Sequence, residues 1–553
     1  VGALSLVLAL MLPVVFLTGI LIQTIRGYFH YEIPLYLVDL LIFNYPTYVL
    51  LAALAVAVQS VVSSKYMGHF IMILYYLSTD FMEEFGFQHI LYSYTRDLGT
   101  TYSDMNGYGH LVWPYLVIKS YWFAVAALML IIGYLFWPRG TELNFRRRLK
   151  TACVRWTPSL RNGTAAVAMI AAVLGTYIYY NTNILNRYYT SWEVEVLQEE
   201  YERFYKKHET APQPRITDVS IRVELDPGTR SMESSGTYRL TNTTDQPVET
   251  VYLTIPDQEI RVDRLTLDRA CRREIDDPEH GFYSLVPEMP IRPGETAVLE
   301  FEVSYHSRGF PNARINNDFA ANGTFINNKE YFPSIGYMPE MELRSDVTRK
   351  KHDLEPKPRM PALDDAHEIN RNYVSGDADW INFEAVIGTA PDQTAVTCGH
   401  LVREWTENNR RYFQYRMDRP MIHFYPILSA RYAVMKESWN GVDLAIYYHP
   451  GHRWNLDRIM NSLKRSLEYY SSEFSPFQYD QLRIIEFPRY NTFAQSFANT
   501  IPYSEAAGFV AQVTGDDVDY PFGITAHETA HQWWAHQVIG ANVQGTTMLS
   551  EML

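Results

Sequence analysis

The sequence predicts a multi-domain protein with an α-helical transmembrane domain, a β-sandwich domain and a C-terminal α/β domain. Three observations predict this order. Long apolar runs fill the first third of the chain, polar and apolar residues alternate with a period of two in the middle, and a strand–helix–strand pattern near the end leads into a helix that carries H-E-x-x-H. With 553 residues, the chain has room for three or four domains.

Composition and chain ends narrow the class of protein. The formal net charge of -14 argues against a nucleic-acid-binding surface, which requires clustered positive charge. Cys153, Cys271 and Cys398 lack C-x-x-C spacing, so we expect no disulfide framework, although pairing of Cys271 with Cys398 stays open. The chain starts at Val1 and stops at Leu553, and we expect it to be a piece of a longer polypeptide.

Residues 1–185 form the predicted membrane domain. Apolar stretches near the ~20 residues that a helix needs to cross a bilayer predict about five transmembrane helices. These stretches are 4–24, 47–62, 66–78, 121–137 and 164–180. The first has no basic residues before it, so we interpret it as a span and not as a signal peptide. The run 33–43 is shorter and carries Asp39, and we expect it to be interfacial or re-entrant.

The distribution of basic residues predicts the orientation. The segment 139–161 holds seven arginine and lysine residues, whereas the loop 80–113 holds only Arg96 among several acids. Cytoplasmic loops carry the excess of Lys and Arg. We therefore predict a multi-pass protein of the cell (inner) membrane, with the chain after about Asn181 extracytoplasmic. The reverse orientation, with the C-terminal half in the cytoplasm, stays open.

A short connection separates the membrane domain from the predicted β-sandwich. Residues 186–214 combine a charged amphipathic helix at 192–207, interpreted as a stalk, with a Pro-containing linker at 211–214. From 215 to 430, apolar residues recur at every second position between turn residues, first at Val219, Ile221, Val223 and Leu225. This period is typical of half-buried strands, and we predict a β-sandwich over 215–430.

Residues 431–553 form the predicted α/β domain. A strand at 444–448, a helical stretch at 453–474 and a strand at 482–487 precede the helix that carries H-E-x-x-H and supply the sheet on which it packs. Pro521 suits the first turn of that helix, and Gly540 follows where a stop is expected.

His527, Glu528 and His531 form the H-E-x-x-H motif. On a helix, residues four apart project from one face, so both imidazoles can bind one metal ion while Glu528 acts on a water beside it. Zinc is the expected ion, because it accepts nitrogen and oxygen ligands and keeps an open position when the protein supplies three. We predict one Zn2+ ion. A chance match on a surface helix is the alternative, since the motif is short.

Glu551 is the predicted third ligand. It is the only carboxylate in 532–553. His536 competes with it, but it lies five positions beyond His531, about 140° around a helix of 3.6 residues per turn, and so points off the metal face. A histidine ten residues after the first is excluded, because that position is Gln537.

These segments resemble a known family. Residues 527–538 (HETAHQWWAHQV) and 544–551 (QGTTMLSE) look like the metal segment of bacterial proteins that fuse an ABC-transporter permease to a gluzincin zinc aminopeptidase of the alanyl-aminopeptidase and leukotriene-hydrolase type. The resemblance covers about 215–553. It implies a thermolysin-like α/β catalytic domain, truncated in this chain, with a peptide substrate. It also implies a lipid bilayer and an ABC ATPase subunit as partners.

The chain departs from the family's pattern in two places. Nineteen residues separate His531 from Glu551, where the family has eighteen, and one extra loop residue is readily accommodated. The family's amine-binding glutamate falls on Ala498, so selection for a free N-terminus loses its charge complementarity. Glu505 is the substitute carboxylate or, more ordinarily, a structural hydrogen-bond acceptor. The aligned substrate-binding strand is Gln495, Ser496, Phe497, Ala498 and Asn499.

The resemblance and the motif together predict peptide hydrolysis. Glu528 would take a proton from water and pass it to the leaving amine, while the backbone of 496–499 aligns the peptide as an added strand. The family's transition-state tyrosine would follow beyond Leu553. The alternative is an ABC-transporter permease subunit whose extracytoplasmic peptidase-like domain binds peptide or a partner without hydrolysis. A purely structural, membrane-anchored sandwich is the third interpretation.

Overall fold

The computed structural model describes residues 1–137, 144–313, 315–366 and 368–546. The chain divides into two compact units. The helical unit comprises Val1–Thr101, His110–Trp192 and Arg308–Ile315, and the sheet unit comprises Tyr102–Gly109, Glu193–Ser307 and Asn316–Leu553. Each unit therefore includes one short segment that lies, in sequence, within the other.

The helical unit contains the apolar N-terminal helices. Their bounds are α1 (Gly2–Ile25), α2 (Ile33–Val38), η1 (Asp39–Asn44), α3 (Tyr45–Val61), α4 (Lys65–Met82), η2 (Gly109–Leu111), α5 (Val112–Phe136), α6 (Phe145–Arg155), α7 (Pro158–Tyr179) and η3 (Tyr180–Leu185). Four helices of the described residues are long and apolar enough to cross a membrane: Gly2–Ile25, Ile33–Val61, Gly109–Phe136 and Pro158–Leu185.

Two membrane predictions need correction. The run 33–43 is not a separate segment, because α2, η1 and α3 continue one another into a single 29-residue helical stretch, Ile33–Val61, which is long and apolar enough to cross a membrane. Asp39 is accommodated there by the Asn44 side chain, which donates to it at 2.9 Å. The stretch 66–78 forms α4, but α4 does not qualify as a span, since residues such as Lys65 and His69 dilute its apolar character.

The helical unit has a small core that contains an ion pair. Leu50, Ile118, Trp122 and Ile178 are among its buried residues. Lys119 is 3% exposed, and its ammonium lies 2.7 Å from Asp97 Oδ2 while it donates to Thr47 Oγ1 and the Thr95 carbonyl, both at 2.8 Å. The charge on α5 is thus fully paired.

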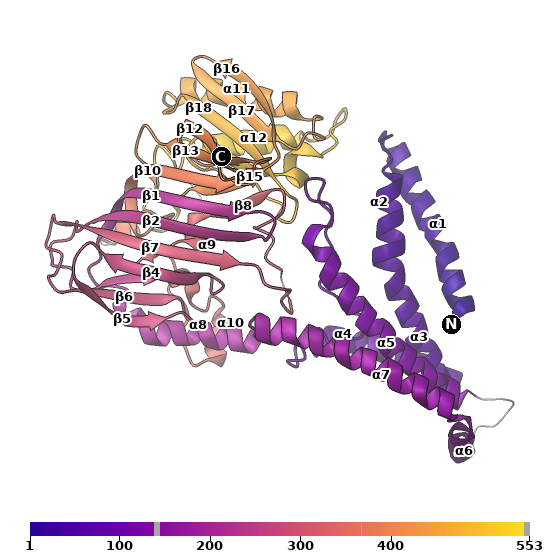
Figure 1. Ribbon diagram of the computed structural model, residues 1–553. Coiled ribbons are helices and arrows are strands. Elements are labelled where there is room, and N and C mark those ends of the chain that lie inside the picture. Colours follow the sequence, from indigo (N-terminus) through magenta and orange to yellow (C-terminus); the bar gives the residue numbers. More distant parts are fainter. Residues whose placement is uncertain (138–143, 314, 367, 547–553) are drawn as a thin grey trace. The chain divides into compact units, whose positions relative to one another are not determined.

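One eight-stranded sheet dominates the sheet unit, in the order β12-β13-β10-β1-β2-β7-β4 (Figure 1). β14 pairs with β10 beside this path. Its strands are β1 (Arg215–Asp226), β2 (Ser231–Thr241), β4 (Arg261–Leu267), β7 (Thr296–His306), β10 (Ala378–Thr389), β12 (His400–Glu407), β13 (Arg410–Arg416) and β14 (Met421–Ile422). The predicted alternation is confirmed on β1, where Val219, Ile221, Val223 and Leu225 are all buried.

Two smaller sheets share a hydrophobic core with the large one. The four-stranded sheet β5-β6-β3-β9 uses β3 (Val251–Thr254), β5 (Cys271–Asp277), β6 (Phe282–Pro287) and β9 (Ser334–Ile335). The three-stranded sheet β11-β15-β8 uses β8 (Thr324–Asn327), β11 (Thr394–Val396) and β15 (Pro426–Ala430). The strands of these three sheets all lie within residues 215–430. All three cysteines are free thiols, so Cys271 and Cys398 are not paired.

The helix predicted as a stalk packs on the sheet unit. Tyr201 and Tyr205 of α8 (Ser191–Tyr205) bury their rings against Phe282 and Tyr337. The Arg349 guanidinium donates to both carboxylate oxygens of Glu202, at 2.7 and 2.8 Å, and both side chains are buried. Figure 1 shows α8 alongside β5 and β6. Aromatic burial and this bidentate ion pair therefore make α8 part of the folded unit.

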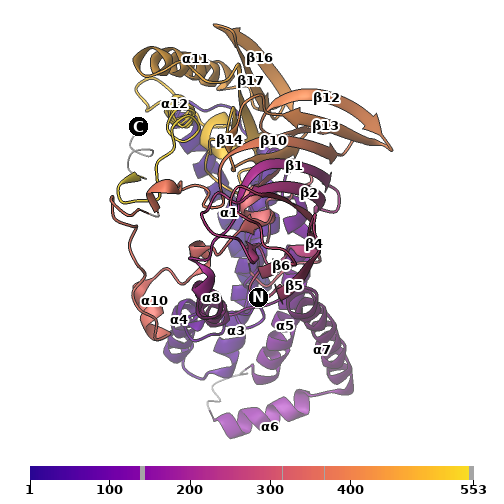
Figure 2. The same cartoon turned by 90° about the vertical axis from the view of Figure 1, so that its left-hand side faces the viewer.

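The predicted strand–helix–strand pattern is confirmed. The fourth sheet has the order β16-β17-β18-β19, and β17, β18 and β19 run parallel. Its elements are β16 (Ala433–Trp439), β17 (Val442–Tyr448), α11 (Leu456–Glu473), β18 (Gln481–Phe487), β19 (Thr500–Ser504) and η7 (Glu505–Phe509). α11 buries Ile459, Leu463 and Leu467 and packs beside α12 (Tyr520–Ala530) (Figure 2).

Candidate metal centre and cleft

The helix that carries the motif is α12, Tyr520–Ala530. Asp519 caps its start, since its carboxylate accepts from the Phe522 N–H at 3.0 Å, and Pro521 lies in the first turn as predicted. The helix ends at Ala530 and not near Gly540, so the predicted length is wrong. Turns follow Ala530, and Gln532 within them contacts residues 496–499.

His527 and His531 converge. Their Nε2 atoms lie 3.2 Å apart, and the ring planes are at 85°. Two nitrogens bound to one tetrahedral zinc ion, each ~2.05 Å from it, lie about 3.3 Å apart. The Trp534 carbonyl lies 3.2 Å from His531 Nδ1, which suits Nδ1–H as the donor and leaves Nε2 for a metal. The two rings therefore fit a shared zinc ion.

Glu528 lies beside a cleft of about 370 Å³. It is only 6% exposed, and His527 lines the same cleft. Other lining residues include Thr492, Phe493, Ala494, Ala507, Tyr520 and Ile524. A carboxylate and an imidazole thus face one space large enough for part of a peptide.

The predicted substrate strand turns away from this cleft. Phe497, Ala498 and Asn499 are fully buried, and Phe497 and Ala498 belong to the hydrophobic core. Phe497 and Thr500 exchange both backbone hydrogen bonds, so Ala498 and Asn499 form a two-residue hairpin turn. Asn499 has φ 48°, a conformation that asparagine tolerates. A side chain at position 498 therefore reaches the core and not the cleft.

Gln532 connects the end of α12 to this hairpin. Its amide donates to Ser496 Oγ at 2.7 Å and to the Phe497 carbonyl at 2.9 Å, and its carbonyl accepts from the Asn499 N–H at 3.0 Å. Gln532 is 1% exposed. This side chain fixes the hairpin against the residues that follow His531.

Ala494 lines the cleft and belongs to the chain segment that pairs with β19. Phe493 and Gln495 pair with β19, through Ser504 N–H to the Phe493 carbonyl and Gln495 N–H to the Pro502 carbonyl, both at 3.0 Å. Backbone groups alternate in direction along an antiparallel strand. The N–H and C=O of Ala494 therefore point to the opposite edge, toward the cleft that Ala494 lines.

Glu505 is buried at the end of β19 and does not line this cleft. Its Oε2 accepts from Ser103 Oγ at 3.0 Å and from the Met105 N–H at 3.5 Å. Burial raises the pKa of Glu505. This placement agrees with a structural hydrogen-bond acceptor.

Glu505 belongs to a buried cluster that the sequence interpretation missed. The His452 ring lies between two carboxylates. Its Nδ1 is hydrogen-bonded to Glu486 Oε1, and its Nε2 lies 3.0 Å from Asp104 Oδ2. Burial raises the pKa of Glu486, while Asp104 and Glu486 outweigh the effect of burial on His452 and raise its pKa. A usable signal was the lone carboxylate of Glu486 within the apolar strand Leu482–Phe487.

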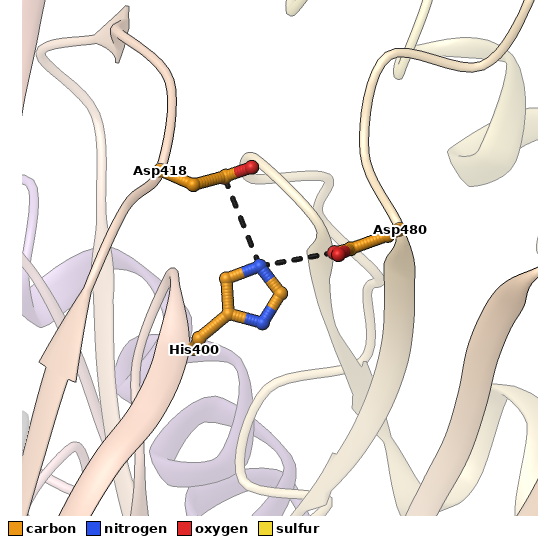
Figure 3. A group of neighbouring side chains, drawn as sticks. All are labelled: His400, Asp418 and Asp480. Atoms are coloured by element: carbon orange, nitrogen blue, oxygen red, sulfur yellow. Dashed lines mark ion pairs between the residues drawn. The ribbon is translucent and has the colours of Figure 1, made fainter.

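A second group of ligand-type residues lies on the surface. His400 Nε2 lies 3.0 Å from Asp480 Oδ1 and 3.7 Å from Asp418 Oδ1 (Figure 3). The carboxylate side chains are 44% and 65% exposed for Asp418 and Asp480. Ion pairs at this exposure are common and contribute little.

Two predicted residues complete the picture around the motif. Glu551, the predicted third ligand, lies outside the described residues. His536 is 1% exposed, and burial lowers its pKa to about 3, so its ring is a neutral core side chain.

Comparisons with known proteins gave distant structural similarity alone. No protein-family model and no curated protein matched. A crystal structure of an M1 zinc metallopeptidase from Deinococcus radiodurans aligns at 12% identity and a TM-score of 0.42, covering 60% of this chain and 66% of that chain. A glutamate-to-alanine mutant of that M1 enzyme bound to a Tyr-Ser-Ala substrate aligns at 13% identity and 0.40. The chain thus spans slightly less than two thirds of those structures.

Proposed function

We propose that this protein is a membrane-anchored, zinc-dependent metallopeptidase that hydrolyses peptide bonds. The observation that carries the proposal is the 3.2 Å separation of His527 Nε2 and His531 Nε2, next to Glu528 on a 370 Å³ cleft. A chance match on a surface helix would also bring residues four apart onto one face, but it would not bury the glutamate beside a cleft. The buried Glu528 is positioned for chemistry and not for solvation.

The proposed roles divide among five residues. His527, His531 and Glu551 would hold zinc, and zinc supplies acidification of water and polarisation of the scissile carbonyl. Glu528 accepts a proton from the attacking water and donates it to the leaving amine. Trp534 holds His531 in the required tautomer through its carbonyl.

The cleft favours a peptide bound as an added strand. The outward-facing N–H and C=O of Ala494 would pair with the substrate backbone, which gives affinity without a requirement for particular side chains. Ala498 and Glu505 both lie in the interior, so neither position offers a carboxylate to a free α-amine. We therefore propose that cleavage does not depend on a free N-terminus.

The proposed location is the cell (inner) membrane. Four long apolar helices support several passes through a lipid bilayer. Seven arginine and lysine residues in 139–161 support a cytoplasmic position for that loop, and hence an extracytoplasmic peptidase unit.

The test is cleavage of internally quenched peptides by the full chain in detergent or nanodiscs. Matched peptides with free and acetylated N-termini are compared, before and after removal of metal with a chelator and after return of Zn2+. We expect zinc-restored cleavage of both peptides at similar rates. Cleavage that survives complete removal of metal would contradict the proposal, and cleavage of the free peptide alone would contradict the stated specificity.

Four spans favour a second candidate function, because one span suffices to anchor a peptidase. An ABC-transporter permease subunit would bind peptide or a partner in the sheet unit and pair with an ABC ATPase. Purification from the native membrane under mild detergent tests this. An ATPase subunit at equal stoichiometry, with no peptide cleavage by the complex, would favour the permease.

A further inference from the structure

A buried cluster lies at the carboxyl ends of three parallel strands. His452 follows β17, Glu486 lies near the end of β18 and Glu505 directly follows β19. β17 pairs in parallel with β18, and β18 with β19. Carboxyl ends of adjacent parallel strands meet at one edge of a sheet, which is where ligands bind in open α/β sheets. The topology therefore gathers three ligand-type residues at one point.

The three side chains are placed as a ligand set. Each offers one ligand atom, and these atoms all lie within 4.8 Å of one another. Glu486 and Glu505 are 0% exposed, and His452 is 4% exposed. None of the three lines the 370 Å³ cleft beside Glu528. The cluster is thus separate from the proposed catalytic residues.

One buried carboxylate oxygen of the cluster has no hydrogen-bond donor among the described residues. Within the described part of the chain, Glu505 Oε1 is buried and has no hydrogen-bond partner, whereas Glu505 Oε2 accepts from Ser103. Glu486 Oε2 is also occupied, because it accepts from the His449 N–H at 2.5 Å. Buried carboxylate oxygens are normally paired or coordinate a metal ion. Glu505 Oε1 is the unexplained atom that a ligand would satisfy.

His452 already has the orientation of a metal-ligating histidine. Its Nε2 lies 3.0 Å from Asp104 Oδ2, which suits Nε2–H as the donor and leaves Nδ1 directed at Glu486. A ligating imidazole almost always donates its other N–H to a carboxylate or carbonyl in this way. Asp104 comes from the segment Tyr102–Gly109, which lies in sequence between α4 and α5 and belongs to the sheet unit.

We propose that His452, Glu486 and Glu505 bind a structural divalent cation, Zn2+ or Mn2+, with Asp104 as the orienting partner of His452. One imidazole and two carboxylates suit these ions better than Ca2+, which prefers oxygen ligands alone. A divalent cation balances the two buried carboxylate charges. It would also fix the ends of β17, β18 and β19 to one another and hold the segment that carries Asp104.

Metal analysis of the full chain tests the site. Zn2+ or Mn2+ equivalents per chain are measured after equilibration and desalting for four proteins: the unmodified chain, Glu505→Gln, the double variant His527→Ala and His531→Ala, and His400→Ala from the exposed group in Figure 3. We expect Glu505→Gln to bind one equivalent fewer than the unmodified chain. His400→Ala should bind as many as the unmodified chain, and the double variant should retain one equivalent.

The other possible results also support or overturn the proposed cation site. Equal stoichiometry in folded Glu505→Gln and the unmodified chain would overturn the proposal. If Glu505→Gln does not fold, the double variant decides: no retained equivalent overturns the site. Asp104→Asn should weaken the retained equivalent about 10- to 100-fold. X-ray absorption of that equivalent should show one nitrogen and at least two oxygen ligands. Failure of peptide cleavage leaves this count unchanged, so the two proposals fail separately.

Discussion

The Nε2 atoms of His527 and His531 lie 3.2 Å apart at the end of α12. The next residue, Gln532, accepts a hydrogen bond from the Asn499 N–H. Without a metal ion between them, the two imidazole rings can share at most one hydrogen bond. The Trp534 carbonyl, in the turns after Ala530, nevertheless holds the His531 ring in place. The two nitrogens therefore lie at the spacing that a shared zinc ion would require.

Replacement of His531 by alanine should abolish the zinc bound at the motif. One of two imidazole ligands is lost, and two remaining protein ligands bind zinc weakly. Zinc per chain, measured by elemental analysis, should fall by one equivalent. His306→Gln, which changes an exposed histidine at the end of β7, is the matched control and should keep the full content. Unchanged zinc in His531→Ala would remove His531 from the ligand set.

Glu528→Gln should keep the zinc and lose hydrolysis. Glutamine preserves the shape of the side chain but cannot accept the proton from water. General acid–base groups contribute about 10²- to 10⁴-fold, and we expect kcat to fall within or beyond that range. Peptide cleavage and zinc content are measured on the same sample. Undiminished turnover would show that another group is the base.

Gln532→Leu should destabilise the protein without removing a metal ligand. The substitution leaves the buried Asn499 N–H without a partner and removes one of the two hydrogen bonds to the Phe497 carbonyl. An unsatisfied buried N–H costs about 1–3 kcal/mol. A lower midpoint of thermal unfolding is expected, together with a reduced kcat because the hairpin carries the cleft-lining Ala494. Gln246→Leu alters an exposed glutamine and should leave the midpoint unchanged.

Glu202→Gln should destabilise the sheet unit in a pH-dependent manner. Removing one partner of the buried Glu202–Arg349 pair costs about 3 kcal/mol. Burial alone would raise the pKa of Glu202, but Arg349 and Lys206 outweigh burial and lower it. A carboxylate with a lowered folded-state pKa stabilises the fold above its unfolded pKa and loses this contribution as the pH falls through the folded value.

The difference in unfolding free energy between the unmodified chain and Glu202→Gln should therefore be full at pH 7. It should shrink as the pH falls below about 4, near the unfolded pKa of glutamate. Chemical unfolding at pH 7, 5 and 3.5 measures it. Glu249→Gln, at an exposed position, should show no difference at any of these values. A difference that stays constant down to pH 3.5 would mean that the lost contact is not electrostatic.

The sequence by itself determined the features that depend on neighbouring residues. Apolar runs predict spans because a bilayer selects for length and hydropathy, and the alternation along Val219–Leu225 predicts a strand because successive side chains point to opposite faces. The H-E-x-x-H spacing predicts converging rings for the same kind of reason, since a helix fixes the direction of residues four apart. Charge along the chain does not place α8, so its packing against Phe282 and Tyr337 was missed.

Only the tertiary structure decided which residues that are far apart in the sequence lie in contact. Ser103 and Glu505 are 402 positions apart, and no local pattern brings them to 3.0 Å. The order and parallel direction of β17, β18 and β19 place His452, Glu486 and Glu505 together. Because of the hairpin turn at Asn499, Ala498 lies in the core and Ala494 lines the cleft. Such contacts depend on packing over the whole sheet, because burial and hydrogen bonding are satisfied only when all the strands are in register.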